Sequence, residues 1–285
     1  MAGRATIYEV GPRDGLQSQK RLIATADKIR LVDLLSDCGL TRIEVASFVS
    51  PKLVPQMADG ADVLAGIARR PGVIYAALTP NMRGYDAARA AKAGEVAIFA
   101  SASEGFSRAN INASIAESLD RFRPVAAAAI ADGTPLRGYI SCVTDCPYDG
   151  PTPPSSVADV ATALLAMGCY QISLGDTIGA AVPGTTAAML GAVLAVAPAE
   201  QIAGHFHDTR GRALDNIAVC LDRGITTFDS SAGGLGGCPF APGASGNVAT
   251  ETVVEMLHDR GFETGLDVPK LVVAARFARS LREVN

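Results

Sequence analysis

The sequence has little net charge and no long apolar run. Its formal net charge is −4 over 285 residues, so the composition lacks the basic footprint that is typical of nucleic-acid-binding proteins. No apolar run is long enough to span a membrane, and the opening residues, Met-Ala-Gly-Arg-Ala-Thr, contain no apolar signal core. We therefore expect a cytoplasmic protein that binds neither nucleic acid nor a membrane.

The six cysteines lack the pattern of a disulfide framework or of a structural zinc site. Cys142 and Cys146 are four residues apart, but no second Cys or His pair follows at zinc-finger spacing. Cys238 lies in the glycine-dense stretch 233–246, where a buried structural cysteine is not expected. The other five fall within or beside predicted strands and helices and are expected in the core: Cys38, Cys142, Cys146, Cys169 and Cys220.

The chain also lacks linkers and low-complexity segments, and eight short apolar runs alternate with helix-like stretches. Such alternation indicates parallel strands joined by crossover helices, and eight units close into a TIM (β/α)8 barrel of about 250 residues. We predict this α/β fold as a single domain over 1–285, with one or two closing helices in 250–285. The alternative is a doubly wound open sheet, but residues 10–15 lack its Gly-x-Gly-x-x-Gly turn. The predicted strands are residues 5–10, 42–48, 73–78, 95–100, 136–143, 171–174, 202–207 and 225–230.

Four of the helical stretches have recognisable ends. Thr25 is the expected N-cap of the first, and Gly39 its stop. Ser114 and Glu117 have the Ser-x-x-Glu spacing of a capping box at the start of the second. The four predicted helices are residues 25–38, 114–131, 156–167 and 215–223.

Polar side chains gather where the predicted strands end, which is the active face of a TIM barrel. His205 and His207 are two residues apart on one strand, so both imidazoles point to the same side. Asp14, after the first strand, is the natural carboxylate partner, and Arg13 beside it offers a fixed positive charge. These ligand types suit a hard or borderline divalent cation, with Mg²⁺, Mn²⁺, Zn²⁺ and Co²⁺ all open.

Three further carboxylates stand near the same strand ends. Glu44 is expected to share a strand face with Ala46 and to point into the barrel, where an unpaired carboxylate is costly. It is therefore either part of the charge network of the site or half of a structural ion pair. Asp176 follows the same reasoning, and Asp208 is a candidate for orienting a ligand.

The thiol of Cys238 is the candidate for further chemistry. The glycines around it predict a mobile lid. An unperturbed thiol has a pKa of about 8.5 and is mostly protonated at neutral pH. It can act as a proton donor or as a nucleophile, and the spacing leaves both open.

Four motifs resemble those of the hydroxymethylglutaryl-CoA lyases, a family of metal-dependent TIM barrels. They are Val-Gly-Pro-Arg-Asp-Gly-Leu-Gln at 10–17, the loop at 47–57, Ser-Leu-Gly-Asp-Thr-Ile-Gly at 173–179, and the Cys238-bearing stretch at 234–247. They occur in order along nearly the whole chain. Two mild departures are Arg210, where an aromatic residue is expected, and Pro242.

The resemblance implies a divalent-metal-dependent lyase that cleaves 3-hydroxy-3-methylglutaryl-CoA to acetyl-CoA and acetoacetate, as in leucine degradation. The implied cofactor is Mg²⁺ or Mn²⁺, with Zn²⁺ or Co²⁺ as alternatives, and the substrate is an acyl-CoA thioester. Arg13 would stabilise charge on the thioester oxygen, Cys238 would be the catalytic thiol, and Glu44 and Asp176 would support the site. The base could be Asp14, another carboxylate or a histidine. The implied metal ligands are Asp14, His205, His207 and Asn247.

Three other functions remain as alternatives. The first is a lyase for a bulkier 3-hydroxy-3-alkylglutaryl-CoA, which would carry the same motifs. The second is a condensing enzyme such as a 2-isopropylmalate or homocitrate synthase, although those are usually longer and lack the Cys-bearing stretch. The third is a non-catalytic barrel, which predicts a broken set of metal ligands. We also expect a homodimer or a higher homo-oligomer.

Overall fold

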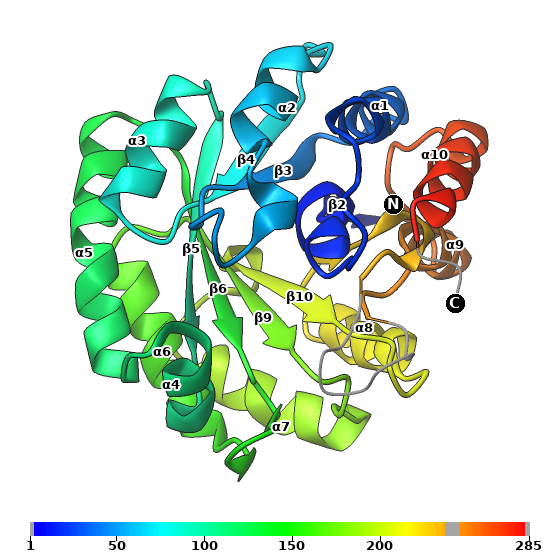
Figure 1. The fold of residues 1–285 in the computed structure, drawn as a ribbon. Helices are drawn as coiled ribbons and strands as arrows, with labels where there is room; N and C mark the ends of the chain where they lie inside the picture. The colour runs from blue at the N-terminus through cyan, green and yellow to red at the C-terminus, as the bar shows by residue number, and fades with distance from the viewer. Residues whose placement is uncertain (1–2, 237–245, 283–285) are drawn as a thin grey trace.

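The computed structural model describes residues 3–236 and 246–282 (Figure 1). Within these residues, eight parallel strands form a closed barrel in the order β10-β11-β2-β3-β4-β5-β6-β9. This confirms the predicted TIM barrel, and each strand overlaps one of the predicted runs. The strands are β2 (Thr6–Glu9), β3 (Arg42–Ser47), β4 (Ile74–Leu78), β5 (Glu95–Ser101), β6 (Leu136–Ser141), β9 (Gln171–Asp176), β10 (Ile202–Phe206) and β11 (Thr227–Ser230).

Helices surround the barrel, and of the last two α10 packs beside α1 while α9 packs against α10 (Figure 1). The predicted closing helices are therefore confirmed as α9 and α10. No helix of the described ranges is long and apolar enough to cross a bilayer. The helices are α1 (Thr25–Ser36), α2 (Gly60–Gly66), α3 (Met82–Ala90), α4 (Glu104–Ile111), α5 (Ile115–Ala131), α6 (Pro154–Ala166), α7 (Pro183–Val193), α8 (Ala213–Asp222), α9 (Thr250–Asp259) and α10 (Val268–Ser280).

Helix ends follow local chemistry, with one correction. The capping box at α5 is present, because Ser114 accepts from the Glu117 backbone and Glu117 accepts from the Ser114 backbone. Gly39 has the positive φ of +91° expected of a helix stop. The prediction that Thr25 caps α1 is wrong. Thr25 is the first helical residue, and its hydroxyl donates to Asp59 at 2.8 Å, so a tertiary partner replaces the local cap.

The apolar core lies mainly between the barrel and its helices, and it includes residues from Ala5 to Leu281. The five described cysteines are buried, as expected. Inside the barrel the packing is more polar. There Arg137 is fully buried, its guanidinium lies 3.9 Å from the centroid of the Tyr8 ring, and it pairs with Asp229. The barrel interior is therefore organised by charge as well as by apolar packing.

Strand β3 carries an irregularity that decides where Glu44 points. The register with β4 shifts between Glu44 and Ala46, and a bulge of this kind breaks the two-residue alternation of faces. Ala46 consequently packs outside the barrel against Gly60 of α2, whereas Glu44 is fully buried and reaches Arg13. The expectation that Glu44 points into the barrel is confirmed, but the expectation that it shares a face with Ala46 is wrong.

Candidate metal centre

The turn after β2 presents two of the predicted site residues. Residues Gly11–Gly15 form one π-helical turn, in which the carbonyl of Val10 accepts the backbone N–H groups of Arg13, Asp14 and Gly15. Such wide turns are rare and occur often at functional sites. This turn directs the Arg13 and Asp14 side chains toward the carboxyl ends of the strands.

Asp14, His205 and His207 form a cluster at those strand ends. One ligand atom from each residue lies within 4.8 Å of the other two, which makes the cluster a possible metal site. His207 forms a backbone bridge with Asn247, and Nδ2 of Asn247 donates to Oδ2 of Asp14 at 2.7 Å. A half-turn of the Asn247 amide would put its oxygen in place of that nitrogen, so Asn247 stands beside the cluster as a candidate fourth ligand.

The electrostatics of the cluster suit a cation. Burial lowers the pKa of His207 to about 4, helped by the neighbouring His205, so this imidazole is neutral at pH 7. Burial acts to raise the pKa of Asp14, but Arg13 and the two histidines lower it to about 2. Nδ1 of His207 is buried without a hydrogen-bond partner among the described residues. The centre thus holds a carboxylate and a neutral imidazole, which are metal ligands in their required protonation states.

Arg13 is held rigidly between two carboxylates. Its Nη1 pairs with Oδ1 of Asp14 at 2.6 Å, and its Nε pairs with Oε2 of Glu44 at 2.6 Å. Its guanidinium also lies 5.5 Å from the centroid of the Tyr139 ring. Burial raises the pKa of Glu44 above its ordinary value, although Arg13 opposes the rise. Arg13 thus lies between Glu44 and the Asp14 carboxylate of the cluster.

Asp229 is a site residue that the sequence reasoning missed. It stands directly opposite His205 in the pairing of β10 with β11, and its Oδ2 lies 3.2 Å from Nδ1 of His205. The same oxygen accepts from Ser173 at 2.7 Å and from Arg137 at 3.1 Å. With Asp229 accepting at Nδ1, the proton of His205 is placed there and Nε2 is left free for a cation.

Two other predicted carboxylates serve the loops around the cluster. Asp176 is buried and accepts the backbone N–H groups of Ala180 and Ala181. Burial raises its pKa to about 6. Asp208 accepts from the backbone of Ala213 at the start of α8. In the part of the chain that the structure describes, neither carboxylate joins the ligand cluster, so both shape the loops that frame it.

Cys238 lies outside the described residues. The ends of the stretch that contains it can be followed, however, and both adjoin the cluster. A side chain at Gly236 would meet Nδ2 of Asn247 at 2.9 Å, and the carbonyl of Gly246 accepts from the Asp208 backbone at 2.7 Å. The Cys238-bearing stretch therefore leaves and re-enters the described structure beside the candidate metal ligands.

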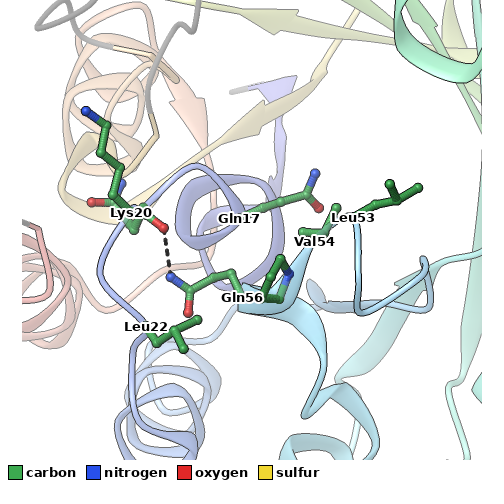
Figure 2. Close-up of a pocket in the computed structure, with 8 residues that line it drawn as sticks. Gln17, Lys20, Leu22, Leu53, Val54 and Gln56 are labelled. Carbon is green, nitrogen blue, oxygen red and sulfur yellow. Dashed lines mark hydrogen bonds between the residues drawn. The ribbon is translucent and has the colours of Figure 1, made fainter.

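A cavity of about 240 Å³ adjoins the turn that carries Asp14 (Figure 2). Gln56 is buried at its floor, where Nε2 donates to the backbone carbonyls of Gln19 and Arg21 and Oε1 accepts from Ile23. One side chain thereby joins the loops that follow β2 and β3. The cavity is lined by Gln17, Gln19, Lys20, Leu22, Leu53, Val54, Pro55 and Gln56.

The fold and the site together define a TIM barrel with a candidate metal centre at the carboxyl ends of its strands. The chain belongs to the HMGL-like family, whose model matches residues 4–278. A curated relative from Pseudomonas aeruginosa, named 3-hydroxy-3-isohexenylglutaryl-CoA/hydroxy-methylglutaryl-CoA lyase, is 56% identical over 273 residues, covering 96% of this chain and 91% of the relative.

Solved structures agree with this assignment. The HMG-CoA lyase from Brucella melitensis superposes with a TM-score of 0.98 at 61% identity, covering 99% of both chains. An HMG-CoA lyase from Acinetobacter baumannii, solved in complex with coenzyme A and 3-methylmalate, gives a TM-score of 0.92 at 37% identity over 98% of this chain and 91% of that one.

The link from Asp229 to His205 predicts a loss of metal affinity when the carboxylate is removed. Asp229→Asn should weaken Mn²⁺ binding by about 10- to 100-fold, the usual effect of losing the carboxylate behind a ligating histidine. Titration followed by electron paramagnetic resonance measures the affinity, and circular dichroism checks that the variant is folded. Asp59→Asn, which breaks an ion pair with Lys28, is the matched control. A folded Asp229→Asn protein with wild-type affinity would contradict the link.

Proposed function

We propose that this protein is a divalent-metal-dependent lyase that cleaves 3-hydroxy-3-methylglutaryl-CoA to acetyl-CoA and acetoacetate. The observation that carries the proposal is the cluster of Asp14, His205 and His207 with Arg13 beside it. The names of two relatives support the choice of substrate. The P. aeruginosa and B. melitensis proteins are 56% and 61% identical to this chain, and each comparison covers nearly all of it.

The donor set of the cluster suits the proposed cofactor. Asp14, His205 and His207, with the amide oxygen of Asn247 after its half-turn, would hold Mg²⁺ or Mn²⁺, and Zn²⁺ or Co²⁺ is compatible with the same ligands. The bound ion would orient the hydroxyl and carboxylate of the substrate and acidify the hydroxyl.

The residues of the chain would carry the remaining steps. A base, for which Asp14 and the histidines are the candidates, takes the proton of the 3-hydroxyl. The C2–C3 bond then breaks, the hydroxyl carbon becomes the ketone of acetoacetate, and the electron pair passes to the enolate of acetyl-CoA. Neither ion pair of Arg13 uses its Nη2, so that edge of the guanidinium can stabilise the enolate oxygen. Cys238 protonates the enolate carbon.

Asp176 would act less directly. It accepts the backbone N–H groups of Ala180 and Ala181, and we propose that it supports catalysis by holding this loop beside β10. Glu44 would do the same for Arg13. Asp176 and Glu44 would therefore support the site without contact to the substrate.

A second substrate is favoured by one specific observation. The P. aeruginosa relative is named as a lyase for both a methyl- and an isohexenyl-substituted hydroxyglutaryl-CoA, and the two reactions need the same catalytic groups. A panel of 3-alkyl substrates separates them by kcat/KM. We further propose that the chain works as a single domain, as a homodimer or higher homo-oligomer, in the cytoplasm, and that its reaction belongs to leucine degradation. Sedimentation and cell fractionation test the assembly and the location.

The proposed reaction predicts a strict dependence on a divalent cation. The purified protein with hydroxymethylglutaryl-CoA and Mg²⁺ or Mn²⁺ should produce acetoacetate and acetyl-CoA in equal amounts. Exhaustive chelation should abolish the reaction, and readdition of the metal should restore it, because the hydroxyl is acidified only by the ion. Elemental analysis of the chelated sample is the control. Full activity in a sample shown to be metal-free would exclude the mechanism.

Arg13 should be needed for turnover. Arg13→Met is expected to lower kcat at least about 100-fold, the low end for loss of a charge-stabilising donor. It also leaves the buried Glu44 carboxylate unpaired, so thermal unfolding must be measured alongside. Arg13→Lys keeps the charge but cannot pair with Asp14 and Glu44 in the same fork geometry. Its kcat should therefore lie between those of the wild type and Arg13→Met. Arg21→Met, at an exposed side chain of the same loop, should be neutral. A near-normal kcat for folded Arg13→Met would remove this role.

Cys238 should be needed for proton transfer and not for metal binding. Cys238→Ala is expected to lower kcat about 100-fold or more, the scale of general acid catalysis, with Mn²⁺ affinity unchanged. Because the five described cysteines are buried, alkylation should strike Cys238 first, and bound substrate should protect it. Cys220→Ala, in α8, is the matched control. Unchanged turnover of Cys238→Ala would exclude a catalytic role for the thiol. Loss of bound metal from this variant would indicate that the thiol is a metal ligand.

A further inference from the structure

Glu9 is a buried carboxylate at the seam where the barrel closes. It lies on β2 opposite Ser230 of β11, so it joins the first barrel strand to the last. It is fully buried, and no step of the proposed reaction uses it. Among the residues that the structure describes, three donors surround it. Oε1 accepts from the backbone of Gly11 at 2.8 Å and of Ala232 at 2.9 Å, and Oε2 accepts from the hydroxyl of Thr250 at 2.7 Å.

Each donor lies close in sequence to a residue at or beside the candidate metal centre. Gly11 opens the turn that carries Arg13 and Asp14. Ala232 opens the short helix Ala232–Gly234 after β11. Thr250 is the first residue of α9, three residues after Asn247. The carboxylate therefore holds segments separated by 223 and 241 positions from its own.

The packing around these segments leaves little freedom. A Cβ at Gly11 would lie 2.9 Å from Oγ of Ser231, and one at Gly15 would lie 2.7 Å from Cβ of Leu235. The Asp14 turn is thus pressed against the chain that follows β11. Beside this fit, Nδ2 of Asn247 donates to Oδ2 of Asp14 at 2.7 Å.

We propose that Glu9 is a positioning residue that sets the Asp14 turn against the Asn247 segment, so that ligands from opposite ends of the chain meet at one metal. The inference rests on the proposed function for the identity of that site. A carboxylate that served only stability could be removed from a folded protein without changing metal affinity, whereas a positioning residue could not.

Variants at Glu9 separate positioning from simple stability. Burial raises the pKa of Glu9 to about 7, against the three donors, so measurements at pH 8.5 keep it ionised. Glu9→Leu fills the space without an acceptor, and Mn²⁺ affinity should weaken by about 10- to 100-fold, as for loss of other groups behind a ligand. Glu9→Gln keeps an oxygen for Gly11 and Ala232 and should rescue affinity to within about 3-fold of wild type. If Glu9→Leu does not fold, Glu9→Asp replaces it with the same expectation, because its side chain is one methylene too short to reach both turns.

Hydrogen exchange gives a readout that does not depend on metal. Glu9→Leu should speed exchange of the amides in 11–16 and 231–236 together. Thr186→Val, which breaks a buried hydrogen bond to Asn216 between α7 and α8, should lower the unfolding temperature without either effect. Unchanged exchange in both segments, or wild-type Mn²⁺ affinity in folded Glu9→Leu, would overturn the inference. Failure of the wild-type protein to bind Mn²⁺ would instead count against the proposed function, and the exchange result would still decide the role of Glu9.

Discussion

The fully buried pair of Arg137 and Asp229 is the interaction on which the rest of the barrel interior depends. The guanidinium donates to both carboxylate oxygens, at 2.6 and 3.1 Å, and two tyrosine rings flank it. Burying one of these charges alone would be costly, whereas a paired and hydrogen-bonded set is tolerated. Oδ2 of the paired carboxylate, which accepts from Arg137 at 3.1 Å, also lies 3.2 Å from Nδ1 of His205. The carboxylate that neutralises the buried Arg137 thereby also orients His205, a candidate metal ligand.

Tyr139 connects this pair to a second set of ion pairs at the rim of the barrel, because its ring lies near the guanidinium groups of both Arg137 and Arg13. Glu44 holds Arg13, and Arg13 holds Asp14. One guanidinium lies between two carboxylates in this chain of contacts, so its charge offsets part of theirs. The groups proposed to touch substrate therefore rest on side chains that are themselves fixed, which is the arrangement that preorganised charge stabilisation requires.

Periodicity and local chemistry were enough to predict the barrel, its eight strands and the capping box of α5. They also brought Asp14, His205 and His207 together, because ligands at strand ends must converge once the barrel closes. Asn247 was predicted only by the resemblance to a known family. What failed depended on distant partners or on irregular backbone. Because of the bulge in β3, Ala46 lies on the outer face of the barrel. The Thr25 hydroxyl donates to Asp59 and does not cap α1. Asp229 lies mid-strand like Glu44 and could have been found by the same argument, but its partner Arg137 is 92 positions away.

The division of the candidate ligands along the chain has a consequence for folding. Asp14 precedes the second strand of the barrel in the sequence, whereas His205, His207 and Asn247 lie in the last third of the chain. During synthesis, most of the barrel must leave the ribosome before the final pairing of β11 with β2 can form. Pairing over so long a sequence separation is slow, because the entropy of loop closure is lost before any contact compensates for it. A cation that binds only the closed barrel would favour this last step by mass action, so the metal supply of the cell would influence how much of the newly made chain reaches its native state.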